Sequence, residues 1–146
     1  MLKRLKIDWG KGKNRTLQEF NFVVLHHTAW PAHADHFDLL LQTAGGPPDF
    51  HGLAAFATLA DVFPAGNPPA LLRRSPDHRL AYLRLEGAVS GGRGKIERVE
   101  GGELSLPARV DWGQAVSFRL KSTRLDGQFW LRPLGRGLHR FELQLR

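Results

Sequence analysis

The stretch VSFRLKSTRLDGQFWLRPLGRGLHRFELQLR, residues 116–146, decides the fold class. Its apolar side chains recur at every second position, which is the period of strands and not the 3.6-residue period of helices. The alternation covers three runs, 116–121, 129–134 and 138–145. Asp126-Gly127 and residues 135–137 separate the runs with residue types that favour tight turns. The pattern predicts an antiparallel meander, and such meanders commonly close as a barrel or a sandwich.

Upstream of this stretch the chain also favours strands over helices. Apolar runs predict strands at 20–24, 36–42 and 80–85. Gly101-Gly102 predicts a hairpin turn between residues 96–99 and 104–106. Loops are predicted at 45–49 and 64–69, and 53–63 is ambiguous between a strand and a strand followed by a short helical turn. We therefore predict a mainly β chain, a small antiparallel β-barrel with short flanking helical segments.

The expected core follows from the inward face of the alternating strands. Its predicted members are Phe37, Leu39, Leu41, Phe118, Leu120, Phe129 and Leu131. At 146 residues the chain fits one domain, which we place at 16–146 behind a basic N-terminal arm at 1–15.

The amino-acid composition limits the kinds of chemical site that the chain can form. The chain has no cysteine, which excludes disulfides, thiolate metal sites and cysteine nucleophiles. Any metal must therefore be held by His, Asp or Glu. No apolar run approaches the ~20 residues of a membrane span, and the Lys–Arg–Lys cluster at the start lacks the apolar stretch of a secretory signal. These features predict a cytoplasmic protein with no membrane partner.

The charge is unevenly distributed along the chain. The formal net charge is +7, yet no Lys or Arg occurs between Thr16 and Leu72, a stretch with five of the seven histidines. Basic residues gather in 1–15 and from Arg119 onward. A region rich in His and Asp between basic flanks suits a metal site beside an anionic, phosphate-bearing partner. A solvated basic surface explains the charge equally well.

His36 and Asp38 are the first candidate metal ligands. They lie two apart in a predicted strand, so their side chains share one face. His27, at the end of the preceding strand, can join them. Two imidazoles and one carboxylate form an open site suited to Mn²⁺, Fe²⁺ or Zn²⁺. The alternative is that these polar residues simply occupy the wet face of an antiparallel strand.

Four short blocks, taken in order, resemble the 3′-phosphoesterase domain of bacterial DNA ligase D and its short free-standing relatives. The blocks are FVV leading to His27, HFDL at 36–39, DHRLAY at 77–82, and a segment from Glu86-Gly87 through GRG at 92–94 to the hairpin FRL…LDGQFWL at 118–131. The resemblance covers about residues 20–133.

The resemblance implies a small β-barrel with the active site in a groove on its outer surface. His27, His36 and Asp38 would bind a divalent metal, typically Mn²⁺, with Zn²⁺ or another transition metal as alternatives. His78 would engage the scissile phosphate, with Tyr82 beside it. The implied activity removes terminal ribonucleotides and 3′-phosphates from DNA ends during repair. The implied partners are DNA or DNA/RNA 3′ ends and a separate ligase or repair protein.

The sequence departs from the family pattern first in the spacing of the ligands. Three extra residues stand between the first histidine and the H-x-D block. This leaves His33-Ala34-Asp35 as a competing match with the family's own spacing. We favour His36 and Asp38 because apolar residues then continue the inward face of the strand.

The second departure is the loss of two cations that contact phosphate in the family. The arginine two residues after the aspartate is Leu40 here, and the block at 56–60 has no lysine. We expect Arg74 or Arg93 to point into the groove instead. The loss also favours an alternative function, a catalytically impaired relative that binds nucleic acid or a repair partner. A barrel that binds a small phosphorylated ligand is a third alternative.

Overall fold

The computed structural model describes residues 5–8, 15–59 and 70–144. Almost all of the regular structure in these residues is β. The strands are β1 (Leu5–Asp8), β2 (Arg15–Thr28), β3 (His36–Gln42), β4 (Leu53–Thr58), β5 (Ala70–His78), β6 (Gly87–Ala88), β7 (Lys95–Pro107), β8 (Val116–Lys121), β9 (Asp126–Gly135) and β10 (Leu138–Leu143). A short 3₁₀ helix, η1 (Leu80–Leu83), lies between β5 and β6.

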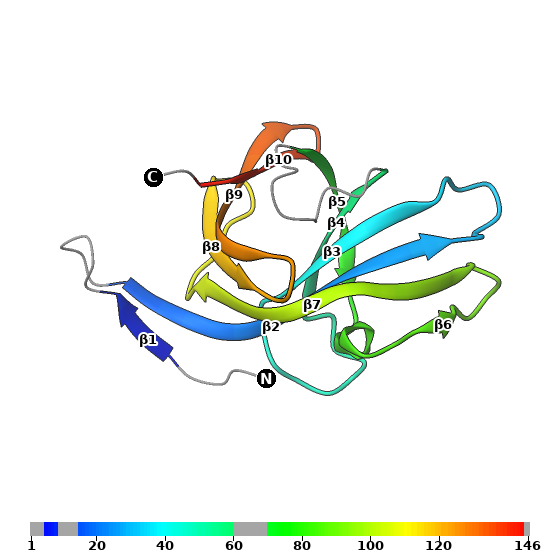
Figure 1. Cartoon of the computed structure of the whole chain (residues 1–146), viewed down its shortest axis with the longest axis horizontal. Helices are drawn as coiled ribbons and strands as arrows, with labels where there is room; N and C mark the ends of the chain where they lie inside the picture. Colours follow the sequence, from blue (N-terminus) through cyan, green and yellow to red (C-terminus); the bar gives the residue numbers. More distant parts are fainter. Residues whose placement is uncertain (1–4, 9–14, 60–69, 145–146) are drawn as a thin grey trace.

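Eight antiparallel strands close into a barrel (Figure 1). Around the ring the order is β2, β3, β4, β5, β10, β9, β8 and β7, and β7 pairs back with β2. β1 and β6 add to β2 and β7 outside the ring. The predicted fold class is confirmed. The flanking helical segments amount to the single turn η1 in the part that the structure describes.

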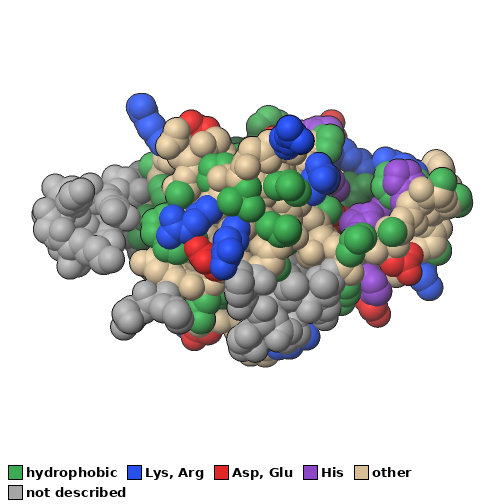
Figure 2. Space-filling model, turned by 90° about the horizontal axis from the view of Figure 1, so that it is seen from above, with side chains coloured by type: hydrophobic (Ala, Val, Ile, Leu, Met, Phe, Trp, Pro, Cys, Tyr) green, Lys and Arg blue, Asp and Glu red, His purple; other side chains and the backbone are tan. Residues whose placement is uncertain are grey.

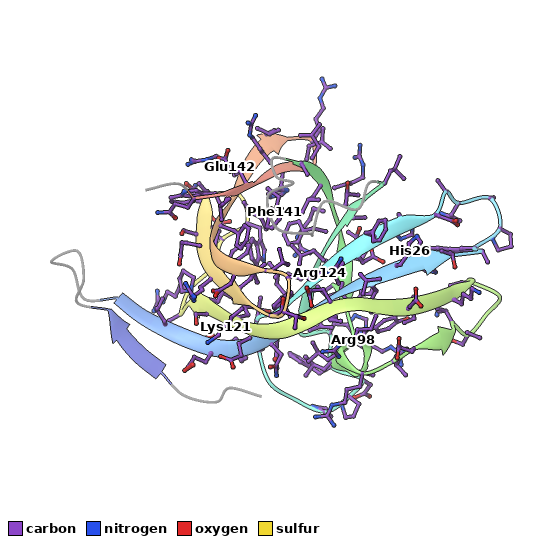
Figure 3. The ribbon with its side chains drawn as sticks, in the orientation of Figure 1. His26, Arg98, Lys121, Arg124, Phe141 and Glu142 are labelled. Carbon is purple, nitrogen blue, oxygen red and sulfur yellow. The ribbon has the colours of Figure 1, made fainter. Side chains whose placement is uncertain are left out.

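The barrel interior holds the main apolar core. Phe22, Leu39, Phe118 and Phe141 are fully buried in it, and Figure 3 shows Phe141 within the ring of strands. Of the predicted core residues, six are buried as expected: Leu39, Leu41, Phe118, Leu120, Phe129 and Leu131. Phe37 is only partly buried at the edge of the core, where it stacks on His26 with ring centroids 4.2 Å apart.

A second apolar cluster covers the opposite face of β2 and β3. It joins Val23 and Leu25 to Leu40 and is closed by Leu80 of η1. Strands buried on both faces are near-continuous apolar runs, as β2 and β3 are here. Leu40 is therefore a packed core side chain. This cluster forms the floor on which the candidate site is built.

Two of the predicted elements are wrong. Residues 80–85 form η1 and a turn, not a strand, because Leu80 packs onto the second cluster while the Arg84 N–H bonds the Ala81 carbonyl at 3.0 Å. Gly101-Gly102 is not a hairpin turn. It lies inside the continuous strand β7, which stays paired with β2 there. A Cβ at Gly102 would collide with the Lys121 carbonyl, so glycine permits this close strand packing.

The turns of the C-terminal meander are partly as predicted. The turn at 135–137 joins β9 and β10, with left-handed backbone at all three residues. The β8–β9 turn lies before Asp126-Gly127, since Lys121 pairs directly with Asp126. Buried Glu100 explains the shift, because its carboxylate accepts hydrogen bonds from the Arg124 N–H at 3.0 Å and the Thr123 hydroxyl at 3.2 Å.

The remaining expectations concern loops and the N-terminal arm. Residues 45–49 are a loop as predicted, and the ambiguous stretch begins as strand β4. The loop at 64–69 and most of the arm at 1–15 lie outside the described residues, apart from Leu5–Asp8, which pairs with the start of β2. Among the described residues no helix is long and apolar enough to cross a membrane.

Candidate metal centre

His27, His36 and Asp38 come together on the outer wall of the barrel. Antiparallel pairing places His27 opposite His36, while Asp38 stands two residues further along β3 on the same face. Asp38 Oδ2 lies 3.3 Å from His36 Nε2 and 3.9 Å from His27 Nδ1. One ligand atom from each residue falls within 4.8 Å of the others, so the three could hold a metal ion.

Backbone carbonyls fix which ring nitrogens face the carboxylate. His27 Nε2 donates to the Arg93 carbonyl at 2.6 Å, and His36 Nδ1 donates to the Ala34 carbonyl at 3.1 Å. A carbonyl only accepts, so in each neutral ring the remaining nitrogen carries the lone pair. Those nitrogens are the two that approach Asp38. Metal-ligating histidines are typically oriented by this kind of outer hydrogen bond. The residues present therefore fit a transition-metal ion.

Electrostatics couple His36 to Asp38. The hydrogen bond to Asp38 raises the pKa of His36, while partial burial of the ring works in the opposite direction. Asp38 is only 5 % exposed, so its negative charge is screened little by water. A bound cation would compensate this buried charge.

His33 and Asp35 do not join this group. The ring of His33 stacks on Trp30 with centroids 3.7 Å apart, and Asp35 accepts a hydrogen bond from the Ala29 N–H at 3.2 Å. Both residues lie in the turn between β2 and β3, which has left-handed backbone at Ala29 and Ala32. The structure therefore brings His36 and Asp38, and not the competing pair, together with His27.

A cleft of about 400 Å³ opens over the three residues. We call it the metal cleft; His78, Tyr82, Arg79, Arg93 and His51 line it together with the His–His–Asp group. Seen from above, histidine side chains gather toward one end of the molecule, near basic side chains (Figure 2). All the expected site residues except Arg74 thus share one concave surface with two residues, Arg79 and His51, that the sequence did not single out.

His78 and Tyr82 meet as expected, although not on one strand. His78 ends β5, and Tyr82 lies on η1. Their rings form an edge contact with centroids 5.1 Å apart. The His78 Nδ1 donates to the Pro76 carbonyl at 2.9 Å, which leaves Nε2 as the nitrogen that can exchange a proton.

Of the two arginines expected to point into the groove, one lines the cleft and the other does not. Arg93 lines the metal cleft, with its guanidinium folded onto the Ser90 carbonyl at 2.8 Å. Arg74 is not among the lining residues: it pairs with Asp77 at 2.8 Å and lies over the Phe56 ring.

Arg79 is the cleft cation that the sequence analysis missed. Its guanidinium lies 5.4 Å from the Tyr82 ring centre and has no carboxylate partner in the described part of the chain. The available signal was its position directly after His78. His51 was also missed, and it donates to the Asp77 carbonyl at 3.2 Å.

Gly94 holds the loop that carries Arg93 against the metal group. Its φ is +79°, and a Cβ would collide with the Thr28 carbonyl and the Trp30 amide. We expect Gly94→Ala to cost about 2–3 kcal/mol of stability and to weaken Mn²⁺ binding about 10–100-fold by moving the Arg93 carbonyl from His27. Urea unfolding and Mn²⁺ titration measure the two effects.

Gly92→Ala is the matched control. Gly92 also has a positive φ, +68°, but a Cβ there would meet nothing within 4 Å. It should lose only about 1 kcal/mol and keep its Mn²⁺ affinity. Equal behaviour of the two variants would show that close packing at Gly94 has no role in the site.

Comparisons with protein-family models and with curated proteins find no match to this chain. The resemblance to the ligase D phosphoesterase domain therefore stays a prediction, and a functional proposal must rest on the site.

Proposed function

We propose that this protein is a metal-dependent phosphoesterase that trims the 3′ ends of DNA, removing terminal ribonucleotides or 3′-phosphates. One observation carries the proposal: the metal-binding atoms of a His–His–Asp group converge in a cleft that also contains a histidine with a free nitrogen and two arginines. Phosphoryl transfer depends mainly on positioning and on stabilising negative charge, and this cleft offers groups for both.

The donor set suits Mn²⁺, Zn²⁺ or Fe²⁺. His27, His36 and Asp38 would hold the ion and leave coordination positions open. A bound divalent cation supplies charge stabilisation at phosphoryl oxygens and lowers the pKa of a bound water. Mn²⁺ is our choice among these ions because of the family resemblance.

The protein's own groups would complete the chemistry. Through Nε2, His78 would protonate the leaving oxygen or hydrogen-bond the phosphoryl group, and Tyr82 would orient its ring. Arg79 and Arg93 would bind the negatively charged phosphate. They would replace the arginine that the family has at the position of Leu40, which is buried here. The proposal includes the cytoplasmic location and the separate ligase or repair protein expected from the sequence.

The packing of Leu40 favours a second candidate function. Leu40 is completely buried in the second apolar cluster, so no cation can occupy its place beside the metal group. A non-catalytic module that binds nucleic acid would tolerate this loss. Its signature would be a DNA affinity that falls steeply with salt and survives removal of the metal ligands.

The proposal is tested by end release from a primer–template that carries a 3′-terminal ribonucleotide or a 3′-phosphate. We expect release with Mn²⁺ and none after chelation. Asp38→Asn keeps the shape of the side chain but removes its charge, and we expect it to lower Mn²⁺ affinity by more than about 100-fold. Turnover should fall to background with it. Calorimetric Mn²⁺ titration and gel-resolved products give the two readouts; release that is equal with Mn²⁺ and with chelator contradicts the proposal.

A further inference from the structure

A second hollow lies directly beside the metal cleft. Its volume is about 500 Å³, and it shares Trp30, His36 and Ser75 with the cleft. We call it the side hollow. Leu59 and Leu71 line it with side chains that are 74 % and 58 % exposed. Apolar side chains this open beside a metal ligand are available to contact part of a bound substrate.

Aromatic rings connect the two spaces. Trp30 stacks on the metal-ligand candidate His27, with centroids 5.1 Å apart and planes 14° from parallel. His33 stacks on Trp30, at 3.7 Å and 16°. The three rings form a column that starts at the metal group and ends at the exposed His33, which also borders the side hollow.

We propose that the side hollow is a nucleobase subsite, and that the protein acts on unpaired 3′ ends. The terminal base would stack on the open end of this column, the exposed ring of His33, while its phosphate lies in the metal cleft. Every base has a flat π-face, so such a platform accepts any sequence. The inference rests on the proposed function, because it names the form of substrate that the same site takes.

An unpaired base fits this arrangement better than a paired one. In a duplex both faces of a base are covered by its neighbours and its edge is occupied by the partner base, so reaching the rings requires unstacking and unpairing. Arg73 borders the side hollow and is exposed, where it could meet the next backbone phosphate. Leu59 and Leu71 would contact the sugar and the base edge.

The test compares two single-stranded pentathymidylates with a 3′-phosphate, one complete and one whose terminal nucleotide lacks its base. We expect the Mn²⁺-loaded wild type to bind the complete strand about 10–100-fold more tightly and to release its phosphate with a correspondingly higher kcat/KM. Trp30→Ala removes the ring on which His33 stacks, so it should bring both ratios close to one, and Trp30→Phe should restore them in part. A blunt duplex should bind more weakly than the complete single strand.

The ratio separates stacking from damage to the metal centre. Because Trp30 touches His27, its loss could disturb the ion, but that would lower binding and turnover of both strands together and leave the ratios unchanged. Trp130→Ala, on β9 and outside both spaces, is the control for a lost aromatic side chain and should keep the wild-type ratios.

The outcomes also separate this inference from the proposed function. Mn²⁺-dependent release with equal rates and affinities for the two strands overturns the base subsite and leaves the phosphoesterase standing. No Mn²⁺-dependent release from either strand or from the primer–template overturns the phosphoesterase; a base-dependent affinity that Trp30→Ala abolishes would still support the subsite, and equal affinities would overturn it.

Discussion

Replacing His78 by alanine should lower Mn²⁺-dependent 3′-end release by about 10²–10⁴-fold, the usual range for loss of a general acid or base. Mn²⁺ affinity should change little, because His78 lines the metal cleft without belonging to the ligand group. Single-turnover rates at saturating Mn²⁺, measured beside a Mn²⁺ titration, give the two quantities. A large loss of rate together with unchanged Mn²⁺ affinity distinguishes a residue that acts on the substrate from a residue that binds the metal.

His51 supplies the matched control for His78. It lines the same cleft, and its ring is likewise held by a backbone carbonyl, that of Asp77. It is exposed, however, and only His78 contacts Tyr82. We expect His51→Ala to retain turnover within about tenfold of wild type, well short of the loss expected for a general acid or base. A His78→Ala variant that keeps its rate, or loses Mn²⁺ together with its rate, would remove His78 from the mechanism.

The metal group was predictable because its geometry is local. Side chains two apart on a strand share a face, so the alternation predicted that His36 and Asp38 would lie side by side. His27 followed from the antiparallel pairing of neighbouring strands, which sets it opposite His36. The hydrogen bond that orients His27 was not predictable, since Arg93 is far away in sequence and its loop conformation depends on Gly94.

The outer apolar layer explains the wrong prediction for residues 80–85. The runs VVL at 23–25 and LLL at 39–41 are apolar at consecutive positions, which indicates strands covered on both faces. Something must then pack on the outer wall, and Leu80 of η1 does so. The apolar residues of this segment have a period that favours a strand, but a turn that covers another sheet face needs apolar residues too.

Which arginine lines the cleft depends on side-chain contacts that the spacing of residues in the sequence does not reveal. Arg74 and Arg79 lie in the same short segment, and both could have entered the cleft. Arg74 stays out of the cleft because it forms an ion pair with Asp77, and its guanidinium also packs over the Phe56 ring. Arg79 follows His78 at the start of η1 and is thereby turned toward Tyr82. The direction of a side chain after a strand end depends on the turn, so the sequence alone left it open.

Phe118→Ala should be the most destabilising single change among those considered, with a loss of about 3–5 kcal/mol in the free energy of unfolding. Phe118 is fully buried in the barrel core, beside Phe129 of the paired strand and facing the ring of Phe141. Its truncation leaves a cavity that a closed barrel cannot fill by collapsing, because every strand is held by two neighbours. Urea unfolding monitored by tryptophan fluorescence measures the loss.

Two further variants test whether the loss of stability depends on burial of the side chain in the core and on the volume that is removed. Leu134→Ala removes a side chain that is 55 % exposed, and it should change stability by less than about 0.5 kcal/mol. Phe118→Leu keeps most of the side-chain volume and should lower the free energy of unfolding by well under half as much as Phe118→Ala does.

Because the candidate metal ligands come from β2 and β3, folded Phe118→Ala protein should bind Mn²⁺ as wild type does. A loss below about 1 kcal/mol would mean that the barrel tolerates the cavity, and a large drop in Mn²⁺ affinity would mean that core packing sets the separation of His27 and His36.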